Sequence, residues 1–190
     1  MGMTVTKRKD SKLPRVFVHK VADIRGGVSV AIADLNVDFL AEGRVIGAPV
    51  SGICHVVKYA KVQANASNSD VKIKVYKGHD FKVGDVVCAA ENGAAYTISA
   101  IDTTKTGYDE ITVGTTLGVA LSKDVSFIFQ AKAEGASGAA LAHEPFALVG
   151  TGKPVIANHN VDTDAWVIGV TKGNDLPALI AGKLKGIINY

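Results

Sequence analysis

The sequence has few of the residues that build disulfide frameworks or metal-binding motifs. Cysteine occurs only at Cys54 and Cys88, and neither residue belongs to a Cys-x-x-Cys pair, so neither a disulfide framework nor a cysteine-based zinc site is indicated. We expect both residues to be buried thiols that behave as small hydrophobic side chains. Aromatic residues make up 6% of the chain, whereas 20 residues are glycine. This composition predicts a core of Val, Ile and Ala, with many turns.

Long apolar runs are also missing. No stretch approaches the roughly 18 consecutive apolar residues of a membrane span, and no apolar signal segment follows the basic N-terminus. We therefore expect no membrane partner and a chain that folds in a reducing cytoplasm. The hydrophobic fraction of 47%, against 21% charged residues, speaks against disorder. A chain of 190 residues suits one domain with extensions and needs no metal or disulfide to fold.

Positive charge is concentrated in the first 20 residues. They hold six lysines and arginines against Asp10 alone, so the remainder of the chain is slightly acidic although the whole chain carries +3. We interpret residues 1–15 as a flexible basic N-terminal arm, either a solvated terminus or a segment that docks on an acidic protein surface or on nucleic acid. The arm contains no aromatic residue for base stacking, which speaks against a nucleic-acid partner.

Short alternating segments dominate the rest of the chain. In "VKIKVY", residues 71–76, apolar and basic side chains alternate with the two-residue period of a half-exposed strand. Gly84 indicates a turn with positive φ, and Asn92-Gly93 is a strong hairpin signal. Strands are expected at residues 16–21, 27–33, 53–63, 71–76, 86–90, 95–101, 111–113, 118–121, 125–133 and 165–171.

This rhythm of strands at intervals of about ten residues predicts a mainly β fold, either a small antiparallel barrel or a sandwich. A short C-terminal helix is expected near Pro177, within residues 176–187. The predicted organisation is the arm, a β-rich domain over residues 16–150, and a C-terminal extension over residues 151–190. That extension has a strand–helix–strand pattern and would pack on the same domain or on neighbouring subunits.

Two segments resemble ligand-binding loops but fail on spacing. Asn158, Asn160, Asp162 and Asp164 place oxygen ligands at every second position, as a calcium loop does at its start. The glycine and the later carboxylate of such a loop are missing, so a polar turn is the simpler interpretation, with a weak ion site near Asp162 and Asp164 left open. The segment "GTGKP", residues 150–154, lacks the first glycine and the Ser or Thr of a phosphate loop.

No catalytic arrangement emerges from the remaining polar residues. The histidines, His19, His55, His79, His143 and His159, form no HxxxH or HExxH pair, although spacing alone leaves open a cluster in space. Cys54 and His55 are adjacent, so in a strand they would point to opposite faces and could not act as nucleophile and base. We therefore predict no enzyme, no catalytic or metal residues and no cofactor; a hydrolase site assembled from distant residues remains an alternative.

Three segments resemble a known family: "KGHDFKVGDVV", "YTISAIDTTKTGYDEITVGTTLGVAL" and "VDTDAWVIGVTKGNDLPALIAGKLKGI". They are similar to head-fibre and head-decoration proteins of tailed bacteriophages, particularly of phages that infect Bacteroidetes. The resemblance covers about residues 50–133 and 160–190. One difference is Lys123, which stands where the family has a glycine before a strand.

The resemblance implies an auxiliary virion protein, made in the host bacterial cytoplasm and attached to the capsid exterior as a homotrimer. The major capsid protein would be its partner, and removal of residues 1–12 would weaken attachment without preventing folding. An alternative is a β module of a phage fibre or bacterial envelope that binds glycans or cell surfaces. Such modules usually present exposed aromatic residues, whereas Trp166 lies in an apolar segment and is expected in the core.

Overall fold

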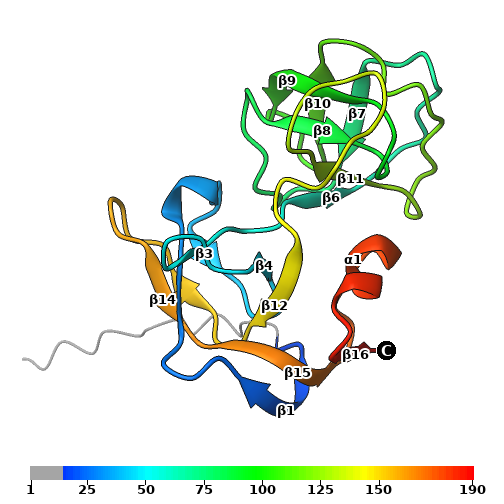
Figure 1. Ribbon diagram of the computed structural model, residues 1–190. Coiled ribbons are helices and arrows are strands. Elements are labelled where there is room, and N and C mark those ends of the chain that lie inside the picture. Colours follow the sequence, from blue (N-terminus) through cyan, green and yellow to red (C-terminus); the bar gives the residue numbers. More distant parts are fainter. Residues whose placement is uncertain (1–14) are drawn as a thin grey trace, which may run out of the picture.

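The computed structural model describes residues 15–190, so the predicted basic arm, residues 1–15, falls almost wholly outside the described part of the chain. The fold is mainly β, with several antiparallel sheets and a short C-terminal helix, as the sequence predicted. Within residues 15–190, no helix is long and apolar enough to cross a membrane. Figure 1 shows two lobes, which the chain connects by passing from one to the other and back.

The first lobe, here called the barrel lobe, comprises residues 59–130. Six antiparallel strands follow one another in the order β6-β11-β8-β9-β10-β7. A further bridge joins Val62, just after β6, to Val75 in β7, and this bridge closes the sheet on itself. The sequence left a barrel and a sandwich open, and this lobe is a closed barrel. Its strands are β6 (Tyr59–Lys61), β7 (Lys72–Val75), β8 (Val86–Cys88), β9 (Ala95–Asp102), β10 (Asp109–Val113) and β11 (Phe127–Gln130).

Alternation in the sequence explains how the barrel is filled. In β7, Ile73 and Val75 are buried in the barrel core, while Lys72 is exposed on the outer face. Phe81 is the largest fully buried side chain of this core. The turns are also as predicted: Gly84 has φ +96° and Asn92 has φ +63°, both in the left-handed region.

The second lobe, here called the open lobe, comprises residues 15–54 and 145–190, so both described ends of the chain contribute to it. The two crossover segments, residues 55–58 and 131–144, connect it to the barrel. Its elements are β1 (Phe17–Asp23), β2 (Val28–Val30), η1 (a 3₁₀ helix, Ile32–Asp34), β3 (Phe39–Leu40), β4 (Val45–Gly47), β5 (Ile53–Cys54), β12 (Pro145–Val149), β13 (Lys153–Pro154), β14 (Val161–Thr163), β15 (Ala165–Thr171), α1 (Ala178–Lys183) and β16 (Ile187–Asn189).

The open lobe contains three sheets. The five-stranded sheet, which we call the main sheet, has the order β1-β15-β12-β4, and β16 pairs with β15 in parallel. A three-stranded sheet has the order β14-β2-β5, and β13 pairs with β3. The C-terminal segment, residues 151–190, is therefore interleaved with the first strands of the same chain. Buried side chains between the sheets, among them Leu40, Ile46 and Val149, form the core of this lobe.

Three predicted strands differ from the observed ones in more than their bounds. Of residues 27–33, expected as one strand, only β2 is a strand, and η1 begins at Ile32. Residues 53–63, expected as one long strand, form β5 and β6 with the first crossover segment between them. The apolar character of this stretch persists because Val56 and Val57 remain buried as the chain passes between the lobes. Residues 118–121 form no regular strand, and Leu121 makes only an isolated bridge with Ala66.

The lobes pack against each other through a shared apolar cluster. Leu148 and Ile180 of the open lobe meet Cys88 and Phe129 of the barrel lobe. An ion pair between Arg44 and Asp80 also joins the lobes. Cys88 is buried here as predicted, and burial raises the pKa of its thiol to about 11.

Candidate functional site

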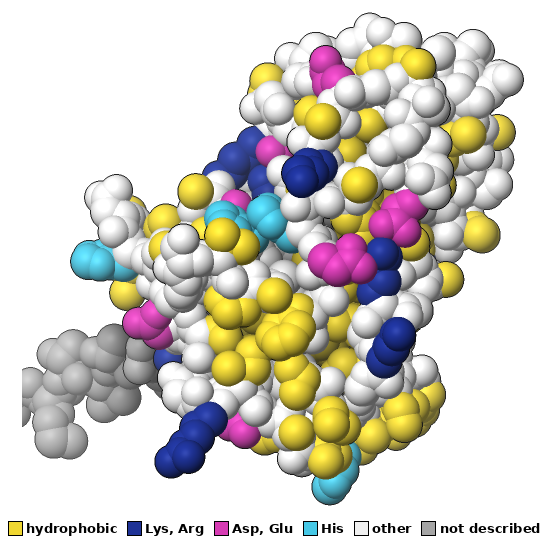
Figure 2. Space-filling model, viewed as in Figure 1, with side chains coloured by type: hydrophobic (Ala, Val, Ile, Leu, Met, Phe, Trp, Pro, Cys, Tyr) yellow, Lys and Arg dark blue, Asp and Glu magenta, His cyan; other side chains and the backbone are white. Residues whose placement is uncertain are grey.

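Exposed hydrophobic side chains gather on the main sheet of the open lobe. Figure 2 shows hydrophobic side chains covering the region where β12 and β15 meet. The residues that we call the apolar set are each 43–65% exposed: Val18, Val21, Phe146, Ile168, Ile188 and Tyr190. All except Tyr190 belong to strands of the main sheet.

The edges of this sheet are also open. Within residues 15–190, β1 pairs with no strand other than β15, and the same holds for β16. No strand therefore covers the outer edges of β1 and β16, which carry side chains of the apolar set, although the backbone N–H of Phe17 in β1 donates a hydrogen bond to Oε1 of Glu42 at 2.9 Å. An open strand edge of this kind is a template for pairing with another chain.

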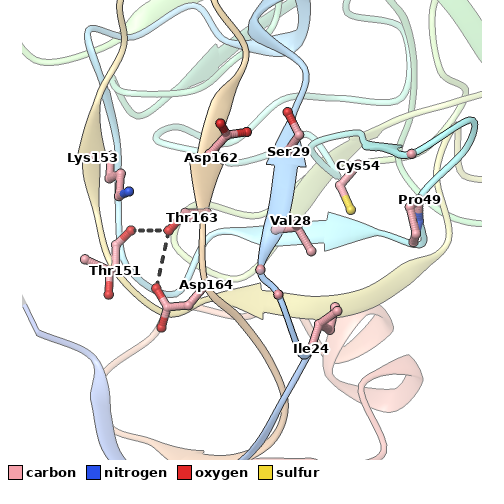
Figure 3. A pocket seen from close by; sticks show the side chains of 13 residues that line it. Ile24, Val28, Ser29, Pro49, Cys54, Thr151, Lys153, Asp162, Thr163 and Asp164 are labelled. Atoms are coloured by element: carbon pink, nitrogen blue, oxygen red, sulfur yellow. Dashed lines mark hydrogen bonds between the residues drawn. The ribbon is translucent and has the colours of Figure 1, made fainter.

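A groove of about 880 Å³ lies in the open lobe, between β2, β14 and the loop before β5. Figure 3 shows Asp162, Ser29, Lys153 and Thr151 around it. Its surface offers carboxylate, hydroxyl and ammonium groups but no aromatic ring. Such a groove can hydrogen-bond a polar ligand without stacking against it.

Two of the four residues whose oxygen atoms the sequence singled out already have hydrogen-bond partners. Oδ1 of Asn160 accepts a hydrogen bond from the backbone N–H of Ile32 at 3.1 Å. Oδ2 of Asp164 accepts one from the indole N–H of Trp166 at 2.7 Å. Burial opposes ionisation of Asp164, but hydrogen bonds from Thr151 and Trp166 outweigh it and lower the pKa of this carboxyl. Asp162 alone is exposed towards the groove.

Trp166 is half-buried, and its indole ring is in contact with three neighbouring side chains. Its N–H is bonded to Asp164, Nζ of Lys20 lies 5.3 Å from the ring centroid, and the Phe17 ring is 6.4 Å away. It does not line the groove. This environment is that of a packing residue at the surface. Trp166 belongs to none of the buried core clusters formed by residues 15–190, so the expectation from the sequence that it lies in the core is wrong.

Two histidines meet where the crossover segments pass the open lobe. His55 is in the first crossover segment, His143 is in the second, and Asp34 ends η1. Nδ1 of His55 lies 2.9 Å from Oδ2 of Asp34, and the two imidazole rings stack with centroids 4.5 Å apart and planes inclined by 5°. Figure 2 shows histidine side chains at the surface between the lobes. Burial, and secondarily His55, lower the pKa of His143.

The positions of Asp34, His55 and His143 in the sequence did not predict that these residues would meet. His55 and His143 are separated by the whole barrel lobe, and Asp34 belongs to an earlier loop. Their proximity follows from the two crossovers, which bring residues 55 and 143 back to one place. The neighbouring Cys54 is fully buried while His55 is partly exposed, as expected for adjacent residues on opposite faces.

A third histidine, His79, belongs to a buried polar group near the contact between the lobes. His79 accepts a hydrogen bond at Nδ1 from the backbone N–H of Phe81, and its Nε2 lies 3.3 Å from Asp109. That approach lacks hydrogen-bond geometry, so Nε2 is unsatisfied. Burial lowers the pKa of His79, more than the adjacent carboxylates of Asp109 and Asp80 raise it. The nearby Lys77 pairs with Asp109 at 2.5 Å.

Comparison of the chain with protein families, with curated proteins and with solved structures finds no match. The resemblance to phage head proteins therefore depends on the three sequence segments quoted above.

Proposed function

We propose that this protein is a non-enzymatic auxiliary virion protein that binds the outside of a phage capsid. The observation that carries the proposal is the apolar set on the open-edged main sheet. Large apolar side chains on strands beside unpaired strand edges are typical of a surface that other protein subunits cover. The partners would be the major capsid protein and two further copies of the chain, in a homotrimer.

The two lobes suit different parts of this role. The closed barrel provides a stiff body, with its apolar side chains directed into its core. The open lobe provides the contact surface, and strands from both described ends of the chain contribute to it. Apolar surface buried against the capsid or between copies would stabilise the assembly by about 25 cal/mol per Å² before the costs of association.

The test is sedimentation of purified protein with capsids that lack it. The wild-type chain is expected to co-sediment in lattice-matched, saturable amounts. A Phe146→Ser/Ile168→Ser variant should bind at least about tenfold more weakly, because both side chains are removed from a buried contact. A matched Val119→Ser/Val125→Ser variant, altered at exposed residues of the barrel lobe, should bind like the wild type.

Circular dichroism and thermal melting establish that both variants are folded. Wild-type protein that stays in the supernatant with such capsids would overturn the proposal, and equal binding by the two variants would exclude the main sheet as the contact surface. A variant without residues 1–12 belongs in the same series, since the sequence predicts weaker attachment without loss of folding. The mass of the wild-type protein in solution tests the trimer.

The alternative, a glycan- or cell-surface-binding module, has the groove beside β14 as its supporting observation. Asp162, Ser29 and Lys153 could hydrogen-bond sugar hydroxyl groups there. Glycan-array binding that is lost in an Asp162→Ala variant and retained in the Phe146→Ser/Ile168→Ser variant would favour this second function. Without any array signal, the groove has no role as a glycan site.

A further inference from the structure

Asp34, His55 and His143 form a group of potential metal ligands. One ligand atom from each residue lies within 4.8 Å of the other two. In the part of the chain that the structure describes, no other three His, Cys, Asp or Glu residues come together in this way. The three side chains belong to three separate segments, so their convergence is a property of the fold.

We propose that Asp34, His55 and His143 bind a divalent transition-metal ion, with Zn²⁺ as the ion of best fit. Two imidazole nitrogens and one carboxylate oxygen are ligands that Zn²⁺ accepts readily, and three protein ligands leave a fourth position for water. Neither the resemblance to phage head proteins nor the proposed attachment to a capsid implies such a site.

The distances need only a small adjustment. Zinc bonds of about 2.0–2.1 Å to nitrogen and oxygen place ligand atoms about 3.3 Å apart in a tetrahedral site. His55 and Asp34 are already at 2.9 Å, so these two atoms separate slightly when both bind the ion. The third ligand atom has to close at most about 1.5 Å, which rotation of the His143 side chain can supply at the expense of ring stacking.

Charge and access also favour a cation. The Asp34 side chain is 16% exposed and that of His55 is 33% exposed, so the group is open to solvent from one side. Two basic side chains approach the group. Nζ of Lys58, in the first crossover segment, lies 2.9 Å from a carboxylate oxygen of Asp85, and this ion pair reduces the repulsion that Lys58 would exert on a bound cation. Nζ of Lys82, in the barrel lobe, donates a hydrogen bond to the carbonyl oxygen of Ala33 at 2.6 Å, and the carboxylate of Asp34 supplies the negative charge that offsets it.

The backbone around the site prevents the ligands from moving far apart. Oδ2 of Asp34 also accepts a hydrogen bond from the backbone N–H of Val56 at 3.0 Å. At Gly47, an added Cβ would lie 3.2 Å from Cβ of His143 and 3.2 Å from the carbonyl oxygen of Glu144, so the absence of a side chain lets the second crossover segment approach β4. A bound ion would tie both crossover segments to η1 and so fix the barrel lobe relative to the open lobe.

The test is a zinc titration of the untagged full-length protein after treatment with a chelator. Isothermal calorimetry should show one Zn²⁺ per chain, and zinc should raise the melting temperature. Binding should weaken at least tenfold in His55→Ala and in His143→Ala. His19→Ala and His159→Ala remove exposed histidines outside the group and should bind like the wild type.

A further variant, Asp34→Asn, separates loss of metal binding from loss of folding. Asp34→Asn retains the size of the side chain and an oxygen that can accept the hydrogen bond from Val56, but removes the charge. It should melt close to the wild type without metal and bind zinc at least tenfold more weakly. Co²⁺ offers an independent readout, because tetrahedral coordination gives intense visible absorption that the three ligand variants should lose. Absence of saturable binding, or binding that only His19→Ala or His159→Ala weakens, would overturn the proposal.

Discussion

The barrel lobe and the open lobe complete the hydrogen bonding of short strands in different ways. The barrel lobe uses one continuous stretch of chain, and a bridge between its first and second strands closes the sheet. The open lobe joins strands from both described ends of the chain, and within residues 15–190 no strand covers the outer edges of β1 and β16 in its main sheet. Closure removes edges that could pair with other chains, whereas an open sheet retains them.

The position of exposed hydrophobic side chains follows the same division. In the barrel lobe they lie outside the strands, at Val71, Tyr76, Val83, Val119 and Val125. In the open lobe most lie on strands of the main sheet. Scattered apolar residues in turns need no special explanation, but apolar side chains on strands with a free edge do. The comparison therefore supports the proposal that the open lobe carries the interaction surface and that the barrel serves as the scaffold.

The largest expected effect tests whether the lobes are one unfolding unit. Phe81→Ala removes the largest fully buried side chain of the barrel core and should lower the free energy of unfolding by about 3–5 kcal/mol. Because an apolar cluster joins the lobes, the loss should also be seen in the open lobe. Trp166 is the sole tryptophan of the chain and lies in the open lobe, so its fluorescence reports that lobe.

Urea denaturation followed by Trp166 fluorescence and by circular dichroism should give one shifted midpoint. Val83→Ala, at an exposed position of the same lobe, should change the free energy of unfolding by less than about 0.5 kcal/mol. A Trp166 transition that stays at the wild-type midpoint in Phe81→Ala would show that the lobes unfold independently.

A smaller effect is expected at a barrel turn. Gly84 has φ +96°, and no atom lies within 4 Å of the place where a Cβ would be. Gly84→Val should therefore destabilise the protein through backbone strain alone, by about 1–3 kcal/mol. Gly107→Ala is the control, since that glycine has open space and no positive φ, and its stability should be unchanged or slightly higher. Equal melting temperatures for Gly84→Val and the wild type would contradict the strain at this turn.

The barrel lobe was the more predictable of the two. Alternation in residues 71–76 and the turn residues Gly84 and Asn92 depend on neighbours in sequence, and their predicted conformations are confirmed. The prediction of one long strand over residues 53–63 was wrong, because a strand and a buried crossover segment are both rich in β-branched residues. Only tertiary structure shows that Val56 packs in the core of the open lobe and that Val57 packs in the apolar cluster that joins the lobes.

The candidate sites of the open lobe depend on distant parts of the chain. The strand over residues 165–171 was predicted with its observed bounds, but its partners β1 and β12 were not. Likewise, local spacing correctly separated Cys54 from His55 and gave no sign of His143. Residues that pair across the whole barrel leave no periodic pattern in the sequence, so the apolar set and the histidine group needed the structure.

The smallest effect concerns pH and the junction between the lobes. Burial lowers the pKa of His79 below the ordinary value of 6.5, so the folded state holds the ring neutral where the unfolded chain would bind a proton. The unfolded state thus binds more protons, and stability should fall as pH drops from about 6.5 through the lowered pKa of the folded state. His143 has a shift of the same sign and contributes in the same direction.

Melting temperatures at pH 7.5 and pH 5.5 provide the measurement. The wild type should lose stability at the lower pH, and His79→Gln should lose less, because a group that titrates differently in the two states has been removed. His19→Gln, at an exposed position, should retain the wild-type difference. The comparison between the two pH values, rather than the absolute melting temperature, is the readout, since His79→Gln also disturbs a buried contact with Phe81. If His79→Gln shows the same difference in melting temperature between the two pH values as the wild type, His79 is not the source of the acid sensitivity.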